Sequence, residues 1–178
     1  MRKRTVMKNN LWAARLLASV ALAACAAAAS PAAAVAPGQF APEISATAAG
    51  GQPLRLGSFQ GQVVLLDFWA SWCGPCKKSF PWMNEMQAKY GPAGLRIVAI
   101  NLDERREDAE HFLAQVPAKF TIGFDTQGKT PGLFGVKGMP SSVLIGANGF
   151  IDSVHAGFRD EDAAVLEQRI ARALEARR

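Results

Sequence analysis

Trp72-Cys73-Gly74-Pro75-Cys76 carries more information about this chain than any other stretch, because two cysteines so spaced can close as a disulfide or open as a dithiol. An apolar segment, 63–69, precedes the motif, and a helical pattern follows it from Cys73 to Tyr90. A cysteine on the first turn of a helix faces unpaired backbone N–H groups and the positive end of the helix dipole, which favour the thiolate. Because the thiolate is the nucleophile in disulfide exchange, this placement predicts a reactive thiol at Cys73.

The first 36 residues differ in composition from the rest of the chain. Residues 2–15 are basic, residues 16–29 are apolar or small and uncharged, and small residues continue through Ala36. This order is typical of a secretory signal peptide, and the apolar run is short for a spanning helix. We therefore assign 1–36 to a signal peptide and Ala-rich leader or tether, and 40–178 to a single domain. The domain is expected in the periplasm or a comparable extracytoplasmic compartment.

Two processing sites fit this leader. Ala32-Ala33-Ala34 fits release of a soluble protein, whereas Leu22-Ala23-Ala24-Cys25 looks like a bacterial lipobox. Processing at the second site would leave Cys25 as a lipid-modified first residue on a flexible tether, and so make the protein a membrane-anchored lipoprotein. A Cys25→Ala variant separates these alternatives, because only a lipoprotein would lose its membrane association.

Charge and cysteine content narrow the function further. The formal net charge of +5 comes from the leader, since fifteen basic and fifteen acidic side chains remain after residue 36, and this balance gives no support to nucleic-acid binding. Outside the leader the only cysteines are Cys73 and Cys76. A structural bridge between them would close a very small loop and stabilise little, and a zinc site would need more ligands. The pair is therefore interpreted as a redox-active disulfide that needs no other cofactor and no metal.

Extended and helical patterns alternate after residue 40. Segments 63–69 and 95–102 are nearly continuous in apolar residues, as in the middle of a sheet, and Asn148-Gly149 indicates a hairpin turn. The order predicts a mixed sheet covered by helices in one α/β domain. The other expected elements are extended pieces at 54–56 and 120–125, hairpin strands at 141–145 and 150–154, helices at 73–90, 105–115 and 160–177, and a helical turn at 129–136.

This order, with a CxxC motif opening the first helix, resembles the thioredoxin fold, and most closely the TlpA/ResA-like extracytoplasmic thiol-disulfide oxidoreductases. One motif of the resemblance is Phe68-Trp69-Ala70-Ser71-Trp72-Cys73-Gly74-Pro75-Cys76-Lys77-Lys78, and the other is Val136-Lys137-Gly138-Met139-Pro140-Ser141-Ser142-Val143-Leu144-Ile145. In the family, a proline at the place of Pro140 is cis and packs beside the cysteines. The resemblance therefore implies a cis Pro140.

The resemblance also implies roles for the cysteines. Cys73 would attack a client disulfide, and Cys76 would resolve the mixed disulfide that results. Disulfide- or dithiol-containing client proteins and a membrane electron donor would be the partners. The same motif can reduce or oxidise, and the Gly-Pro pair together with Asp67 favours a reductant.

Asp67 and a group of residues around the cysteines complete the candidate site. Asp67 lies in an otherwise apolar strand, where burial would raise its pKa. Thioredoxins use an aspartate at this place to help deprotonate the buried cysteine, although a hydrogen-bonded core aspartate is the alternative. Where thioredoxins keep a lysine on the next strand, this chain offers only Arg96. The expected substrate groove consists of Trp72, Gly74, Pro75, Met139 and Pro140.

Departures from the patterns of related proteins, and the possibility of a metal site, bear on alternative functions. Ser79 stands where cytochrome c maturation members of the family often carry an acidic residue, which counts against a dedicated apocytochrome c client. Copper delivery is the non-enzymatic alternative, in which His155 would complete a site with Cys73 and Cys76. A peroxidase is discounted, because Ala70 stands where the P-x-x-x-T-x-x-C pattern has its threonine.

Overall fold

The computed structural model describes residues 34–177, so the predictions for the leader, Cys25 among them, lie outside the described residues. No helix in this part of the chain is long and apolar enough to cross a membrane. The elements formed by residues 34–177 are β1 (Ala46–Ala48), β2 (Pro53–Leu54), a 3-10 helix (Leu56–Phe59), β3 (Val63–Trp69), α1 (Cys76–Tyr90), β4 (Leu95–Asn101), α2 (Arg106–Gln115), β5 (Thr121–Phe124), α3 (Lys129–Phe134), β6 (Ser141–Ile145), β7 (Ile151–Ala156) and α4 (Asp162–Glu175).

The described strands form one mixed sheet in the order β2-β1-β5-β4-β3-β6-β7. β3 pairs parallel with β4 and antiparallel with β6, so it lies inside the sheet. All of its residues are buried, which accounts for its continuous apolar sequence. The predicted hairpin is confirmed by the antiparallel pairing of β6 with β7, and Gly149 adopts a positive φ of 83° in its turn.

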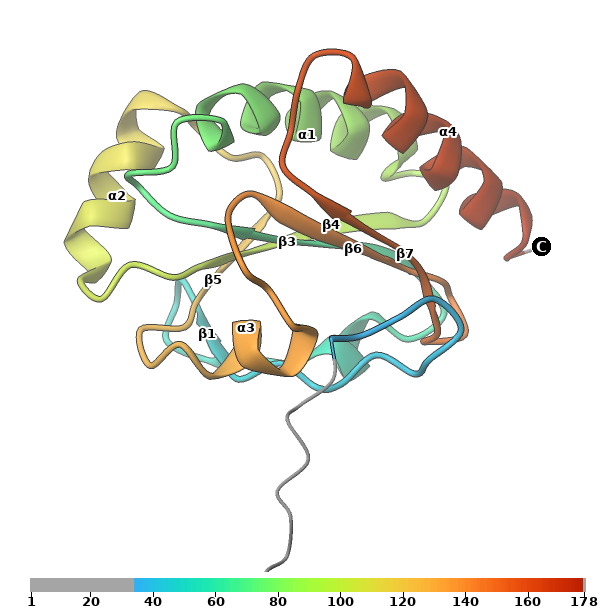
Figure 1. Cartoon of the computed structure of the whole chain (residues 1–178), viewed down its shortest axis with the longest axis horizontal. Coiled ribbons are helices and arrows are strands. Elements are labelled where there is room, and N and C mark those ends of the chain that lie inside the picture. The colour runs from blue at the N-terminus through green and yellow to red at the C-terminus, as the bar shows by residue number, and fades with distance from the viewer. Residues whose placement is uncertain (1–33, 178) are drawn as a thin grey trace, which may run out of the picture. The chain divides into compact units, whose positions relative to one another are not determined.

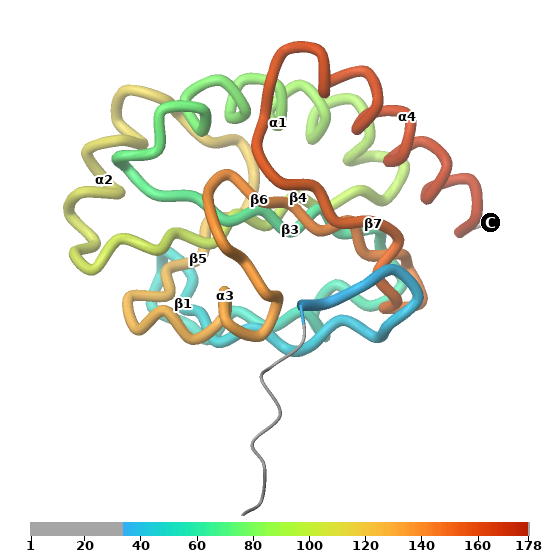
Figure 2. The backbone as a smooth tube through the Cα atoms, in the orientation of Figure 1, coloured from blue at the N-terminus to red at the C-terminus, as the bar shows by residue number. Residues whose placement is uncertain are grey.

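The sheet separates two apolar layers. Helices α1, α2 and α4 cover one face, and α3 lies on the other face with the 3-10 helix (Figures 1 and 2). Side chains alternate along β3, so Leu65 and Trp69 pack toward α1 while Leu66 and Phe68 pack toward α3. Asp67 lies two residues from Leu65 and two from Trp69, so its side chain points to the same face of the sheet as theirs. The face of the sheet that carries Asp67 is therefore the face that carries α1 and α4.

An aromatic cluster fills the core beneath the start of α1. The Trp69 ring lies 4.9 Å from the rings of both Phe80 and Phe112, and the Phe80 ring lies 5.2 Å from that of Phe120. Trp69 and Phe80 are fully buried. Trp69 is thus a core residue that anchors the end of β3 just before the cysteines.

The N-terminal part of the sheet differs from the sequence prediction. Residues 54–56 were expected to be extended, but β2 ends at Leu54 and the 3-10 helix begins at Leu56. The short strand β1 was not expected, and it pairs antiparallel with both β2 and β5. Ala-Thr-Ala is too short and too weakly apolar to indicate a strand, so this element depends on the tertiary pairing that its neighbours provide.

Candidate active site

Cys73 and Cys76 form a disulfide, with their Cα atoms 5.4 Å apart. Both side chains belong to the core on the α1 face, because Cys73 is only 4% exposed and Cys76 is 0% exposed. Cys73 was expected to be the cysteine nearer to solvent, and it is the more accessible of the two by this small margin. A client sulfur must therefore react first at Cys73, since Cys76 is closed off by the core.

The start of α1 corrects the expected position of Cys73. The helix begins at Cys76, and Pro75 caps it, so Cys73 lies in the turn before the helix instead of on its first turn. The Cys76 N–H donates to the Cys73 carbonyl and the Lys77 N–H to the Gly74 carbonyl, at 3.2 and 3.1 Å. These are i→i−3 bonds of a 3-10 turn. The tighter turn, which the apolar periodicity could not reveal, delays the α-helical ladder by three residues.

Asp67 lies in β3, two residues before the end of that strand, inside the core. Asp67 is only 3% exposed, and burial raises the pKa of its carboxyl group well above the ordinary value of 3.8. Oδ2 of Asp67 receives no hydrogen bond from residues 34–177. The predicted burial is confirmed, and a carboxyl group in this environment can hold and release a proton closer to neutral pH.

The expected groove residues are only partly brought together. Met139-Pro140 is a cis peptide bond, as the family resemblance implied, and Pro140 is buried at the start of β6. Because Ser141 pairs with Phe68, this bond lies next to the end of β3. Residues 70–75, which join β3 to α1 and are called the cysteine loop below, begin there. Met139 and Pro140 line an apolar cavity with residues 134–138. Trp72, which is 72% exposed, lies outside that cavity's lining, as do Gly74 and Pro75.

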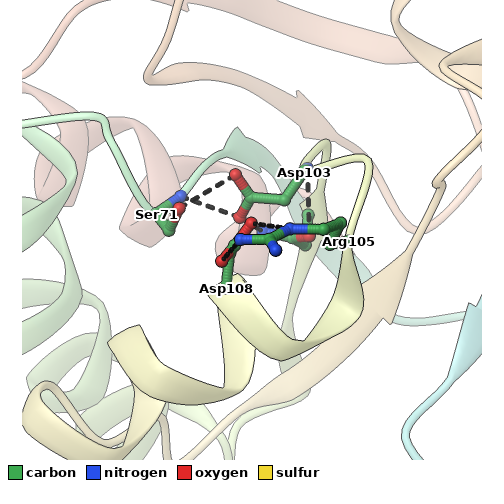
Figure 3. A network of polar contacts seen from close by, with 5 residues as sticks. Ser71, Asp103, Arg105 and Asp108 are labelled. Atoms are coloured by element: carbon green, nitrogen blue, oxygen red, sulfur yellow. Dashed lines mark hydrogen bonds and ion pairs between the residues drawn. The ribbon is translucent and has the colours of Figure 1, made fainter.

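A polar cluster that the sequence did not predict holds the cysteine loop. The backbone N–H and the hydroxyl group of Ser71 donate to the two carboxylate oxygens of Asp103, at 2.9 and 3.0 Å, and Nδ2 of Asn101 donates to the same carboxylate at 2.7 Å. Figure 3 shows Ser71 directed at Asp103, with the neighbouring Arg105 paired instead with Asp108. Asp103 is buried, so it fixes the loop two residues before Cys73. The only hint of this cluster in the sequence was the pair of polar residues, Asn101 and Asp103, at the end of an apolar strand.

His155 lies elsewhere than the copper interpretation requires. Within residues 34–177, no group of three or more His, Cys, Asp and Glu side chains is placed to hold a metal ion. Nε2 of His155 lies 3.5 Å from Oδ2 of Asp162, at the start of α4. The ligand set Cys73, Cys76 and His155 is therefore not assembled in the described structure.

The comparisons with known proteins agree with this geometry. A family model described as Redoxin matches residues 36–170. The thiol-disulfide oxidoreductase ResA of Bacillus thuringiensis subsp. konkukian is 37% identical over 112 residues, which make up 63% of this chain and 65% of that protein. The chain thus spans just under two thirds of the length of this relative. ResA of Geobacillus thermodenitrificans is 32% identical over 142 residues, 80% of this chain and 82% of that protein.

Solved structures show the same likeness. The crystal structure described as that of a thiol:disulfide interchange protein DsbE from Chlorobium tepidum is 53% identical in sequence, with a TM-score of 0.77. The match covers 79% of this chain and 99% of that one. A solution structure described as that of a protein disulfide isomerase from Bacteroides thetaiotaomicron is 29% identical, with a TM-score of 0.72.

Proposed function

Because the chain belongs to the redoxin family of the thioredoxin superfamily, we propose that it is a thiol-disulfide oxidoreductase whose Cys73–Cys76 pair exchanges disulfides with client proteins. The match and the structural likeness confirm the predicted thioredoxin-like α/β fold and the predicted family. The observation that carries the proposal is the Cys73–Cys76 disulfide at the start of α1, in which Cys73 is the slightly more accessible cysteine.

In the reducing direction the chemistry takes two exchange steps. The Cys73 thiolate attacks one sulfur of a client disulfide, so that a mixed disulfide forms and the other client sulfur leaves as a thiolate. The Cys76 thiol then loses its proton, and its thiolate attacks Sγ of Cys73. The second client sulfur leaves as a thiolate, both client thiolates take up protons, and the two electrons come from the Cys73–Cys76 dithiol. A donor at the membrane would reduce the pair again.

Asp67 is the group we assign to the second step. Its carboxylate would accept the Cys76 proton, and its burial on the α1 face of the sheet supports this role. A buried acid with a raised pKa is a better proton acceptor than an exposed one, because its conjugate acid is less acidic. Asp67 thus serves proton transfer, while the sulfur chemistry belongs to the cysteines.

We also place the domain outside the cytoplasm, on the strength of the basic, apolar and small segments in residues 2–36. An oxidising compartment is where a protein disulfide persists and where disulfide-bonded clients occur. Lipid attachment at Cys25 remains the anchored alternative to soluble release. Apocytochrome c is one client with paired cysteines, although Ser79, which is buried and donates its hydroxyl to the Cys76 carbonyl at 3.2 Å, leaves that position without a charge.

Reduction of insulin tests the proposed function directly. The reduced protein should reduce insulin disulfides, and Cys73→Ser should abolish this activity. Cys25→Ala is the matched control, because it removes the chain's only other cysteine and should leave the rate unchanged. Activity that survives in Cys73→Ser would overturn the proposal. Equilibration of the pair with glutathione buffers gives its reduction potential, and a potential well above that of glutathione would overturn the reducing direction.

A further inference from the structure

A row of polar side chains runs across three strands of the sheet, β3, β6 and β7, starting at the buried carboxyl group of Asp67. In the strand register, Asp67 on β3 is the direct partner of Ser142 on β6, and Ser142 is the direct partner of His155 on β7. Side chains of directly paired residues project from the same face of a sheet, with Cβ atoms about 4.5–5.5 Å apart. Asp67, Ser142 and His155 therefore stand side by side on the face that carries α1 and α4.

The far end of this row opens beneath α4. Ser142 and His155 line one small cavity together with Ser153 and with Arg169 of α4. Nε2 of His155 is buried and makes no hydrogen bond with the described part of the chain, although Oδ2 of Asp162 lies 3.5 Å away. The imidazole ring is partly exposed, with 27% of its side chain accessible. His155 thus connects the interior of the sheet face with solvent at the N-terminal end of α4.

We propose that Ser142 and His155 form a proton route between Asp67 and solvent during the second exchange step, an inference that rests on the proposed function. Asp67 and His155 are separated by two strand spacings of about 4.8 Å each, too far for direct transfer. A hydroxyl group between them can accept one proton and donate another. An imidazole can gain and lose a proton near neutral pH, which suits the end of such a route.

Each transfer balances. The Cys76 thiol gives its proton to the Asp67 carboxylate. The neutral carboxyl group donates to the Ser142 oxygen while the Ser142 hydroxyl proton passes to His155. The imidazolium then releases a proton to solvent, and Asp67 is a carboxylate again. The net result is one Cys76 thiolate and one proton in solvent, with no change of oxidation state along the route.

Charged groups of both signs lie near His155. Asp162 and Arg169 of α4 line its surroundings, Asp152 lies on its own strand, and β6 carries no charged residue. Oδ2 of Asp162 lies 3.5 Å from Nε2 of His155 and could accept a proton that this nitrogen carries, while Arg169 brings a positive charge to the same cavity. Oδ2 of Asp162 also accepts the Arg159 N–H at 2.8 Å, which holds this carboxylate in place.

Single-turnover kinetics across pH test the route. With the reduced protein and a model disulfide peptide, Ser142→Ala and His155→Gln should each slow resolution of the mixed disulfide by about tenfold near neutral pH. This is less than the roughly 100-fold or more expected for loss of a general base itself, because Asp67 is retained. Ser142→Thr should restore the rate, because it keeps the hydroxyl group. Ser153→Ala is the matched control, since Ser153 lines the same cavity but pairs with Leu144 and lies outside the row.

The Asp67→Asn background separates a proton route from a packing effect. In that background the substitutions at Ser142 and His155 should have no further effect on the rate, because the carboxylate that accepts the Cys76 proton is already missing. Rates that stay unchanged in Ser142→Ala and His155→Gln, or losses that persist in the Asp67→Asn background, would overturn the inference while leaving the proposed function intact. A wild-type protein that fails to reduce the peptide at any pH would instead overturn the proposed function, and the inference with it.

Discussion

Replacing Asp67 by Asn should change how the free energy of unfolding depends on pH, because its carboxyl group is buried when folded and solvated when unfolded. Burial raises the folded pKa well above the value of 3.8. A group with a raised folded pKa stabilises the protein fully below its unfolded pKa, and this contribution is lost as the pH rises toward the folded pKa. Within that window the wild type should lose about 1.4 kcal/mol per pH unit relative to Asp67→Asn.

Urea unfolding of the oxidised wild type and of Asp67→Asn, from about pH 4 to about pH 9, measures this difference. The variant should gain on the wild type as pH rises, and the difference should become constant above the folded pKa. Asp152→Asn is the matched control, because Asp152 is exposed on β7 and surface substitutions change stability by less than about 0.5 kcal/mol. A difference between wild type and Asp67→Asn that stays flat over the whole range would refute the raised pKa that burial gives this carboxyl group.

Three further substitutions probe the scaffold and the surface of the site. Phe80→Ala should lower the free energy of unfolding in urea by about 3–5 kcal/mol, because Phe80 is fully buried against Trp69; a loss below about 1 kcal/mol would contradict this packing. Asp103→Ala should lower it by roughly 2–4 kcal/mol, since the buried Nδ2 of Asn101 and the partly buried donors of Ser71 lose their acceptor, and an unchanged urea midpoint would argue against the cluster. Trp72→Ala should change it by less than about 0.5 kcal/mol and raise KM for a disulfide-bonded client, because Trp72 is largely exposed; an unchanged KM would remove Trp72 from the client surface.

Local patterns in the sequence accounted for the centre of the fold. The continuous apolar run 63–69 is β3, and Asn148-Gly149 is the turn between β6 and β7. A lone acidic residue in such a run could be predicted to be buried, and Asp67 is. These features depend on neighbours in the sequence, which is why they could be read from it.

Features that depend on distant partners could not be predicted. Strand β1 exists because Thr47 finds both Pro53 and Phe124 as partners. The hydrogen bonds of Ser71 to Asp103 join loops that follow two different strands. Ser142 meets Asp67 and His155 only because β6 inserts between β3 and β7. In each case the strand register, and not the residue type, brings the groups together.

Trapping of the mixed disulfide tests the roles of the two cysteines most directly. Reduced Cys76→Ser, mixed with a disulfide-bonded client such as insulin, should accumulate a covalent complex on a non-reducing gel that dithiothreitol releases. Cys73→Ser should form none, because Cys76 is fully buried and cannot reach the client. A complex that forms equally with Cys73→Ser, or that is missing from Cys76→Ser while the wild type reduces insulin, would contradict the assignment of Cys73 as the attacking thiolate.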